Sequence, residues 1–182
     1  ARALLATLIR GPVAFASSGP NFVAESRIGD AGGRATFEYD LAQNTSQPLV
    51  TNNFAWQSGQ PSPFTLTYDA AADTVTFAVP GSTRPDTMQI APGLRPTPTF
   101  NTLKLFAVSR LAAGTTFSSV LLDDLAFDGR PLNDLGDGTI LVESGGSETL
   151  YLAGIPSGSF TLTGSITMTW AGERPRQSAM NV

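Results

Sequence analysis

The sequence predicts an all-β protein, a two-sheet antiparallel β-sandwich of jelly-roll type with a short N-terminal helix or extended arm. Three observations predict it. In the stretch FTLTYDAAADTVTFAV, residues 64–79, apolar residues alternate with threonine and alanine on both sides of a polar tip, as in a β-hairpin with one buried face. Similar short apolar runs recur, with turn-forming residues between them. No segment supplies the crossover helices that a parallel sheet needs.

A chain of 182 residues suits one domain with a substantial core. We expect residues 1–20 to form an arm and residues 21–182 to form a single sandwich domain. The arm begins like a signal peptide, but Arg10-Gly11-Pro12 interrupts its apolar run. We therefore interpret it as mature protein, with a short helix over residues 3–9 and an extended apolar segment after it.

Within the domain, apolar runs and alternation predict about ten strands. They lie at residues 21–28, 35–41, 49–51, 64–68, 75–79, 99–110, 115–129, 139–143, 149–155 and 159–170. Residues 80–98 hold five prolines and few strand formers, so an irregular surface excursion is expected there. Residues 171–182 are expected to form a tail or a terminal edge strand.

The composition excludes most catalytic chemistry. The chain contains no histidine and no cysteine, so it lacks the Ser-His-Asp triad, a thiol nucleophile and the commonest zinc ligands. Its glutamates are scattered, and no pair of carboxylates stands out on strands that face a common cleft, as a glycosidase would need. We predict that the protein is not an enzyme.

Charge and hydropathy limit the classes of partner that the protein can bind. The formal net charge is −4 without a basic stripe, which disfavours nucleic acid. No apolar run reaches the ~18 to 20 residues of a transmembrane helix. Lys104 is the only lysine, while Thr, Ser, Gly, Pro and Asn are abundant. This composition is typical of secreted and surface β-proteins, so we predict an extracellular or cell-surface location.

Five aspartates lie between residues 123 and 137, three of them in predicted turns and Asp123-Asp124 at a predicted bulge or strand end, and all five are the candidate metal ligands. They are Asp123, Asp124, Asp128, Asp134 and Asp137. Oxygen ligands on loops suit Ca²⁺, but the spacing matches no EF-hand loop. Ordinary turn chemistry is the favoured interpretation, because Asp128 and Asp137 are each followed by glycine. No cofactor other than this calcium alternative is expected.

Aromatic and hydroxyl side chains raise the alternative of a carbohydrate ligand. Trp56 lies in a polar loop and is the candidate for stacking on a sugar, although closing the core is the favoured role. Threonines line one side of the hairpin at 64–79 and of the strand at 159–170. Such a face fits a polysaccharide or ice lattice, but it is also ordinary strand chemistry on a solvated or subunit-packing surface.

The candidate assembly residues lie in two places. Leu103 and Leu105 point to one side of their strand, and Phe106 and Val108 point to the other. A strand that is apolar on both faces is either central between packed layers or lies at an interface. In the arm, the candidates are Pro12, Val13 and Phe15, within a segment that a neighbour could accept by strand addition.

Three segments resemble the bacterial choice-of-anchor surface domains of the PEP-CTERM-associated type. They are residues 64–79, residues 101–132 and the closing segment 158–182, which ends with the pattern Trp170-Ala171-Gly172-Glu173-Arg174-Pro175-Arg176-Gln177-Ser178. The resemblance covers about residues 65–182 and is carried by structural residues. It implies a secreted β-sandwich, often displayed through a separate C-terminal sorting signal, and it implies no catalytic residue.

These observations predict an extracellular structural subunit of a bacterial surface fibre, layer or biofilm matrix. Its partners would be copies of itself, joined into a filament or sheet through β-strand edges or through the N-terminal arm. The alternative is a carbohydrate-binding surface module, with Ca²⁺ as an optional ligand.

Overall fold

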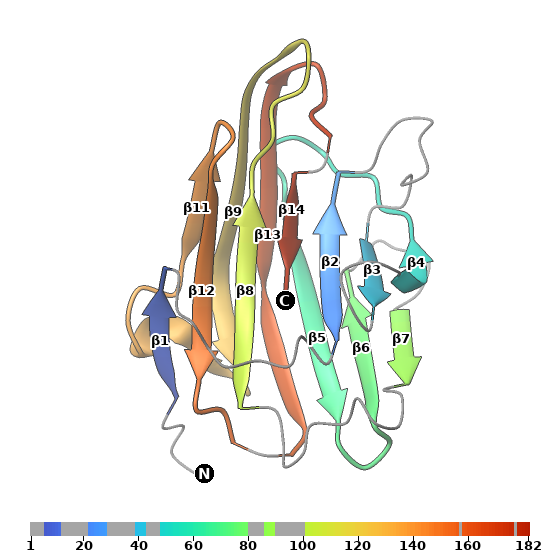
Figure 1. Ribbon diagram of the computed structural model, residues 1–182, viewed down its shortest axis with the longest axis vertical. Coiled ribbons are helices and arrows are strands. Elements are labelled where there is room, and N and C mark those ends of the chain that lie inside the picture. Colours follow the sequence, from blue (N-terminus) through green and yellow to red (C-terminus); the bar gives the residue numbers. More distant parts are fainter. Residues whose placement is uncertain are drawn as a thin grey trace.

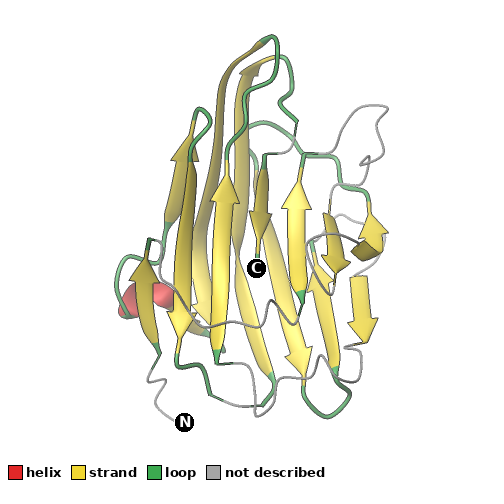
Figure 2. Ribbon diagram, in the orientation of Figure 1, coloured by secondary structure: helices red, strands yellow, loops and turns green. Residues whose placement is uncertain are grey.

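The computed structural model describes residues 6–11, 22–28, 39–42, 48–79, 86–89, 101–156, 158–176 and 178–182, with the backbone alone at 48, 49, 86–89 and 181. This part of the chain is nearly all β (Figure 2). It consists of two antiparallel sheets packed face to face (Figure 1). The predicted β-sandwich is therefore confirmed, while its jelly-roll connectivity stays a prediction.

The first sheet, sheet A, contains seven strands in the order β1, β12, β8, β14, β2, β3, β4. Their bounds are Thr7–Arg10 (β1), Ser147–Ala153 (β12), Thr102–Val108 (β8), Ala179–Asn181 (β14), Val23–Arg27 (β2), Tyr39–Ala42 (β3) and Pro48–Asn52 (β4). Strands from both ends of the sequence therefore lie in one sheet.

The second sheet, sheet B, has the order β10, β9, β13, β5, β6, β7, and β11 pairs with β9 alongside β10. The bounds are Arg130–Pro131 (β10), Thr115–Phe127 (β9), Phe160–Gly172 (β13), Pro61–Asp69 (β5), Thr74–Ala78 (β6), Asp86–Gln89 (β7) and Ile140–Glu143 (β11). A 3₁₀ turn, η1 (Leu132–Asp134), connects β10 towards β11.

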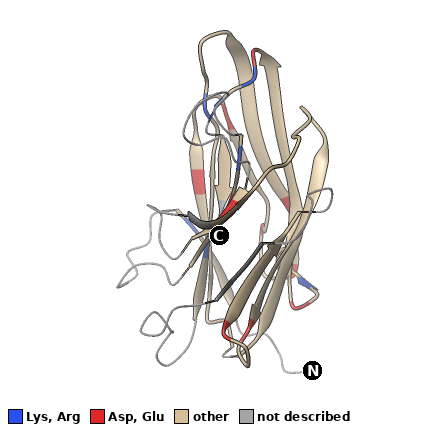
Figure 3. Ribbon diagram, turned by 90° about the vertical axis from the view of Figure 1, so that its right-hand side faces the viewer, with Lys and Arg blue, Asp and Glu red and all other residues tan. Residues whose placement is uncertain are grey.

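Apolar side chains from the inner faces of both sheets form one core, and Figure 3 shows the two layers from the side. Tyr39 of sheet A meets Phe77 of sheet B edge to face, with ring centroids 5.9 Å apart. In sheet B, the rings of Phe127 and Phe160 stack at 5.5 Å. Such contacts hold the layers together by apolar burial and ring packing.

The hairpin predicted over residues 64–79 is confirmed as β5 and β6. Phe64, Leu66 and Tyr68 are buried along β5, while the threonines between them are only half-buried. At the tip, Asp69 accepts hydrogen bonds from the backbone N–H groups of Ala71 and Ala72 at 2.9 and 3.2 Å. This aspartate is therefore a turn-capping residue.

A β-bulge interrupts the pairing of β9 with β13. Asp124 has a positive φ of 51°, and the register shifts between Thr163 and Ser165. The extra residue turns Leu125 into the core. Leu125 packs directly over Gly164. A β-carbon at position 164 would lie 2.5 Å from Leu125 Cδ2 and 2.9 Å from Phe64 Cε1, so the position has no room for a side chain.

The helix predicted over residues 3–9 is wrong for the part that the structure describes. Thr7–Arg10 form strand β1, antiparallel to β12, with Leu8 opposite Leu152. A helix of so few residues is marginal in water. Pairing with β12 satisfies backbone N–H and C=O groups that a helix would also have paired. A strand also suits the β-branched residue Ile9 better than a helix does.

Two further expectations need correction. Residues 86–89, placed in an irregular excursion, form β7 and pair with β6 at the edge of sheet B, where a flanking proline is tolerated. The C-terminal segment was expected as a tail or edge strand, but β14 lies between β8 and β2 and pairs with both. Sequence pattern alone does not place a three-residue strand within a sheet.

Among the described residues, no helix is long and apolar enough to cross a membrane.

Candidate assembly edge

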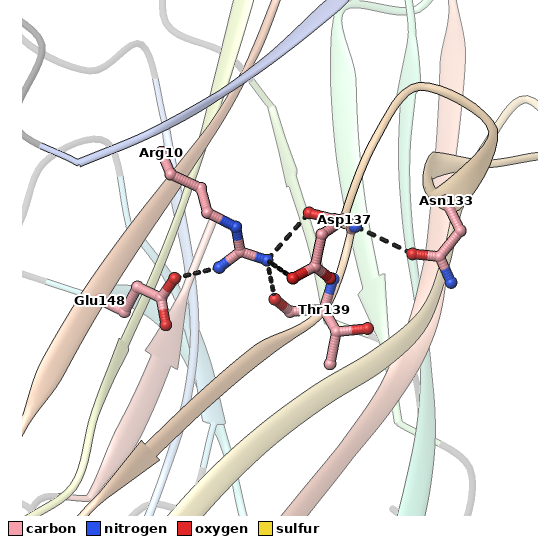
Figure 4. A network of polar contacts seen from close by, with 6 residues as sticks. Arg10, Asn133, Asp137, Thr139 and Glu148 are labelled. Atoms are coloured by element: carbon pink, nitrogen blue, oxygen red, sulfur yellow. Dashed lines mark hydrogen bonds and ion pairs between the residues drawn. The ribbon is translucent and has the colours of Figure 1, made fainter.

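A polar cluster around Arg10 joins the two sheets on one side of the sandwich (Figure 4). The guanidinium forms ion pairs with Glu148 of β12 and with Asp137, whose Oδ2 is 3.0 Å from Arg10 Nη2. The same nitrogen donates to the backbone oxygens of Asp137, at 2.9 Å, and of Thr139. One side chain of β1 therefore connects sheet A with the segment that leads into β11 of sheet B.

The loop that receives Arg10, residues 132–139, is shaped by its own sequence. Leu132 is fully buried and anchors η1. Asn133 Oδ1 accepts the backbone N–H of Gly138 at 2.9 Å, and Asp137 Oδ1 accepts the N–H of Thr139 at 3.0 Å. A β-carbon on Gly138 would lie 2.7 Å from Leu132 Cβ. Only glycine allows this tight closure, which presents the carbonyl groups to Arg10.

Both sheets end on this side in short strands. β1 pairs only with β12, and β11 pairs only with β9, among the strands that the structure describes. The outer edges of these two strands thus lack a described strand partner. On β11, Leu141 faces outwards with 52% of its surface exposed, next to the half-buried Leu121 of β9. This side of the molecule combines strand edges with an exposed apolar side chain.

The outer face of sheet B carries threonines in register. Thr67 of β5 is opposite Thr76 of β6 and opposite Thr161 of β13. In the next outward row, Thr65 is opposite Thr163. All five are half-buried, so the face is a neutral surface of hydroxyl and methyl groups.

Three buried serines form hydrogen bonds that hold the residue before β14 in place. Ser109 Oγ donates to the backbone oxygen of Ser118 at 2.9 Å, and Ser118 Oγ is 3.2 Å from Ser178 Oγ. Ser178 Oγ also accepts the backbone N–H of Arg110 at 3.0 Å. The cluster connects both sheets through hydrogen bonds.

The five predicted metal-ligand aspartates are not brought together. Within the described ranges, no group of three or more acidic side chains could hold a metal ion. Asp137 pairs with Arg10, and Asp134 lies 3.9 Å from Arg130. Asp128 has a positive φ of 49° and accepts the N–H of Thr161 at 2.8 Å. Asp128 and Asp137 therefore have the turn roles favoured for them, and the ion pairs of Asp134 and Asp137 were not expected.

The remaining two, Asp123 and Asp124, lie side by side at the bulge. Asp123 Oδ1 is buried and has no hydrogen-bond partner within the described part of the chain. Burial raises the pKa of the Asp123 carboxyl above its ordinary value, and the charge of Asp124 raises it further. The bulge explains why two aspartates are adjacent here. The positive φ of Asp124 bends the strand, and this lets Leu125 take the inward position.

Trp56 lies against the core, with 6% of its surface exposed. Its indole N–H donates to the backbone oxygen of Arg27 at 2.9 Å, and Phe54 packs against its ring at 4.5 Å. Trp56 therefore packs as a core residue, which is the role favoured for it.

Strand 102–108 is an interior strand of sheet A, one of the two alternatives left open for it. Leu103 and Leu105, two of the predicted assembly residues, are buried in the core. On the opposite face, Phe106 is half-buried with the ammonium of Lys104 5.5 Å from its ring centroid, and Val108 is buried. The other predicted assembly residues, Pro12, Val13 and Phe15, lie outside the described residues.

The sequence did not reveal the Arg10 cluster. Arg10 and Asp137 are 127 positions apart, and no local pattern connects them. The one available signal was that the loop at 132–139 combines acidic residues with glycines, which was attributed to turn chemistry.

No protein-family model matches the chain, and a search of curated proteins found no similar sequence. The resemblance to choice-of-anchor domains stays a prediction.

Proposed function

We propose that this protein is a non-catalytic structural subunit of an extracellular bacterial fibre, layer or matrix, which assembles with copies of itself through strand edges. The observation that carries the proposal is the side formed by β1 and β11. Sheet A ends there in β1 and sheet B in β11 and the two-residue β10, and the outer edges of β1 and β11 have no strand partner in the described part of the chain.

Strand edges expose N–H and C=O groups that another chain can pair with, and soluble proteins commonly protect them with lysine, proline or a bulge. The β11 sequence, Ile140–Glu143, has none of these, and its only charge is Glu143. Exposed Leu141 adds an apolar contact on the same strand. This combination supports pairing with a second chain.

The other parts of the proposal rest on different support. Absence of histidine and cysteine from the sequence supports a non-catalytic role. The near absence of lysine, the many hydroxyl residues and the resemblance to choice-of-anchor domains support an extracellular location. The net charge of −4 supports a partner other than nucleic acid.

The test is imaging the purified protein by negative-stain electron microscopy, together with light scattering over a concentration series. We expect ordered filaments or sheets. Leu141→Ser should raise the concentration needed for assembly and leave the melting temperature nearly unchanged. Leu111→Ser is the matched control, because Leu111 is similarly exposed, at 48%, but follows β8 instead of lying on β11. A protein that stays monomeric throughout would contradict the proposal.

A second candidate function, binding of a polysaccharide, is favoured by the in-register threonine face of sheet B. An in-register array of hydroxyl and methyl groups suits repeated contacts with sugar rings. Glycan-array binding that is lost in Thr67→Val, which keeps the side-chain shape, would favour this alternative. Thr7→Val provides the control, since Thr7 is an exposed threonine of sheet A. Calcium would enter here only if a chelator reversed the binding.

A further inference from the structure

Strand β1 differs from the other strands of sheet A in how it is held. It has four residues, lies at the end of the strand order and pairs only with β12 within the described part. Its partner strand is more than 130 positions away in sequence, so no hairpin turn ties the two together. The contacts between β1 and β12 can therefore form within one chain or between two chains.

The contacts are specific but modest. Ala6 is buried and Leu8 and Ile9 are half-buried. Gly11 N–H donates to the Thr149 oxygen at 3.2 Å. The polar ties of Arg10 are accessible to solvent, with 34% of its side chain exposed. Exposed ion pairs stabilise a fold only slightly. The contacts of Arg10 therefore fix the position of β1 on β12 but add little to the free energy that holds it there.

Strand β12 depends on β1 to pair the backbone groups along its edge. Leu150 and Leu152 of β12 are fully buried, and each lies directly opposite a β1 residue. Departure of β1 would open this edge, with its unpaired backbone groups, to water. A second β1 of identical sequence would restore every contact, which is why strand exchange costs little at equilibrium.

The connection to the rest of the chain is long enough for exchange. β2, the next strand in sequence, is separated from β1 by β12, β8 and β14, a distance of about 19 Å for four strand spacings. Residues 11–22 join β1 to β2 and could span about 40 Å when fully extended. This length permits β1 to reach a neighbouring molecule.

Strand β14, the other strand near an end of the sequence, is unsuited to exchange. It pairs on both sides, with β8 and β2. Ser178, immediately before it, is buried in the serine cluster. Removing β14 would split sheet A between β8 and β2, whereas removing β1 shortens the sheet by its end strand.

We infer that β1 is an exchangeable donor strand, which pairs with β12 of its own chain in the monomer and with β12 of a second copy in the assembled protein. Arg10 then binds Asp137 and Glu148 of the second copy through the same contacts. The inference rests on the proposed self-assembly and specifies the donor segment and its acceptor. Passing β1 from each copy to the next gives an open chain, and reciprocal exchange gives a closed dimer.

The absence of cysteine from the sequence allows a direct test by disulfide trapping. Thr7 and Ala153 are directly opposite on the outer face of β1 and β12, at a Cα separation of about 5.5 Å that suits a disulfide. Chains with Thr7→Cys alone and Ala153→Cys alone are mixed while unfolded, refolded, allowed to assemble and oxidised. Non-reducing gels then report links between the two kinds of chain. Ile9→Cys with Tyr151→Cys provides a second opposite pair.

The matched control is Thr65→Cys mixed with Ala78→Cys. These residues are also directly opposite on an outer face, but they belong to the β5–β6 hairpin and pair within one chain. We expect covalent dimers from the Thr7 and Ala153 mixture and their absence from the hairpin mixture. The double variant Thr7→Cys/Ala153→Cys should give covalent multimers in the assembled fraction.

The outcomes separate this inference from the proposed function. Polymers in which the double variant is linked only within single chains overturn strand exchange and leave the structural role standing. Covalent closed dimers without filaments support exchange and overturn the fibre or layer. A monomeric protein linked only within itself overturns both.

Discussion

Nη2 of Arg10 lies 3.0 Å from Oδ2 of Asp137, and this ion pair joins the edge strand of one sheet to the loop before the edge strand of the other. The core of the sandwich is apolar, but this side is fastened by polar contacts that solvent reaches. Polar, partly exposed contacts are the kind that open locally at low free-energy cost. We therefore expect the side that carries the proposed assembly edges to open more readily than the apolar core.

Replacing Arg10 with Met should loosen β1 with little change in global stability. The substitution keeps an apolar stem but removes the ties to Asp137, Glu148 and the two backbone oxygens. Exposed ion pairs contribute up to about 1 kcal/mol each, so the loss of two should accelerate amide exchange of residues 8–11 up to about thirtyfold. Hydrogen exchange with mass spectrometry measures this.

Arg130→Met is the matched control for that experiment. Arg130 lies 3.9 Å from Asp134, in the same part of the molecule, but has no place on β1. It should leave exchange of residues 8–11 unchanged. Equal acceleration in both variants would mean that a general loss of charge, and not the Arg10 contacts, controls β1.

Ser26→Ala should leave the protein as stable as before or stabilise it by about 1 kcal/mol. The Ser26 side chain is fully buried in sheet A, and its hydroxyl oxygen has no hydrogen-bond partner among the described residues. Removing an unpaired buried hydroxyl removes a desolvation cost without losing a bond. Urea unfolding measures the change in the free energy of unfolding.

Ser178→Ala makes the comparison decisive, because Ser178 is equally buried but hydrogen-bonded to Arg110 N–H and close to Ser118. Its loss should destabilise by about 1–2 kcal/mol. If both serine variants lost the same stability, hydrogen bonding would not be what separates these two sites.

The sequence was sufficient for the sandwich and for most strands, because a period of two and turn residues are local signals. The hairpin at 64–79 and the turn role of Asp69 followed from such signals and are confirmed. Strand β1 and the interior position of β14 were missed, because both strands are short and gain their stability from partners far along the chain. The Arg10 contacts depend on the same long-range pairing, so they could not be predicted before β1 was placed.

Gly164→Ala should destabilise the protein by about 1–3 kcal/mol, as overpacking of a core does. The added methyl group would meet Leu125 Cδ2 at 2.5 Å and a ring carbon of Phe64 at 2.9 Å. In the double variant Gly164→Ala/Leu125→Ala, the space left by Leu125 should offset part of the cost. Unfolding free energies of both single variants and the double variant form the test. Strict additivity would show that contact with Leu125 is not the cause.

The Asp123–Asp124 pair predicts a specific pH dependence of stability. Because burial and the neighbouring charge raise the pKa of Asp123 in the folded protein, the folded state holds this proton more tightly than the unfolded chain. Its contribution to stability is fully present below the ordinary aspartate pKa of about 3.9, and it is lost as pH rises through the raised folded value. Asp123→Asn should therefore be more stable than the unaltered protein at neutral pH, and this advantage should shrink on acidification.

Asp124→Asn isolates the contribution of the neighbouring charge. Asparagine tolerates the positive φ of 51° at this position, so the bulge is kept while a charge is removed. The pKa of Asp123 should fall towards its ordinary value, which weakens the pH dependence without abolishing it, because burial remains. Urea unfolding at a series of pH values, analysed as differences between variants, cancels the titration of the other carboxylates. Difference curves that stay flat across the series for both variants would show that this pair does not couple folding to pH.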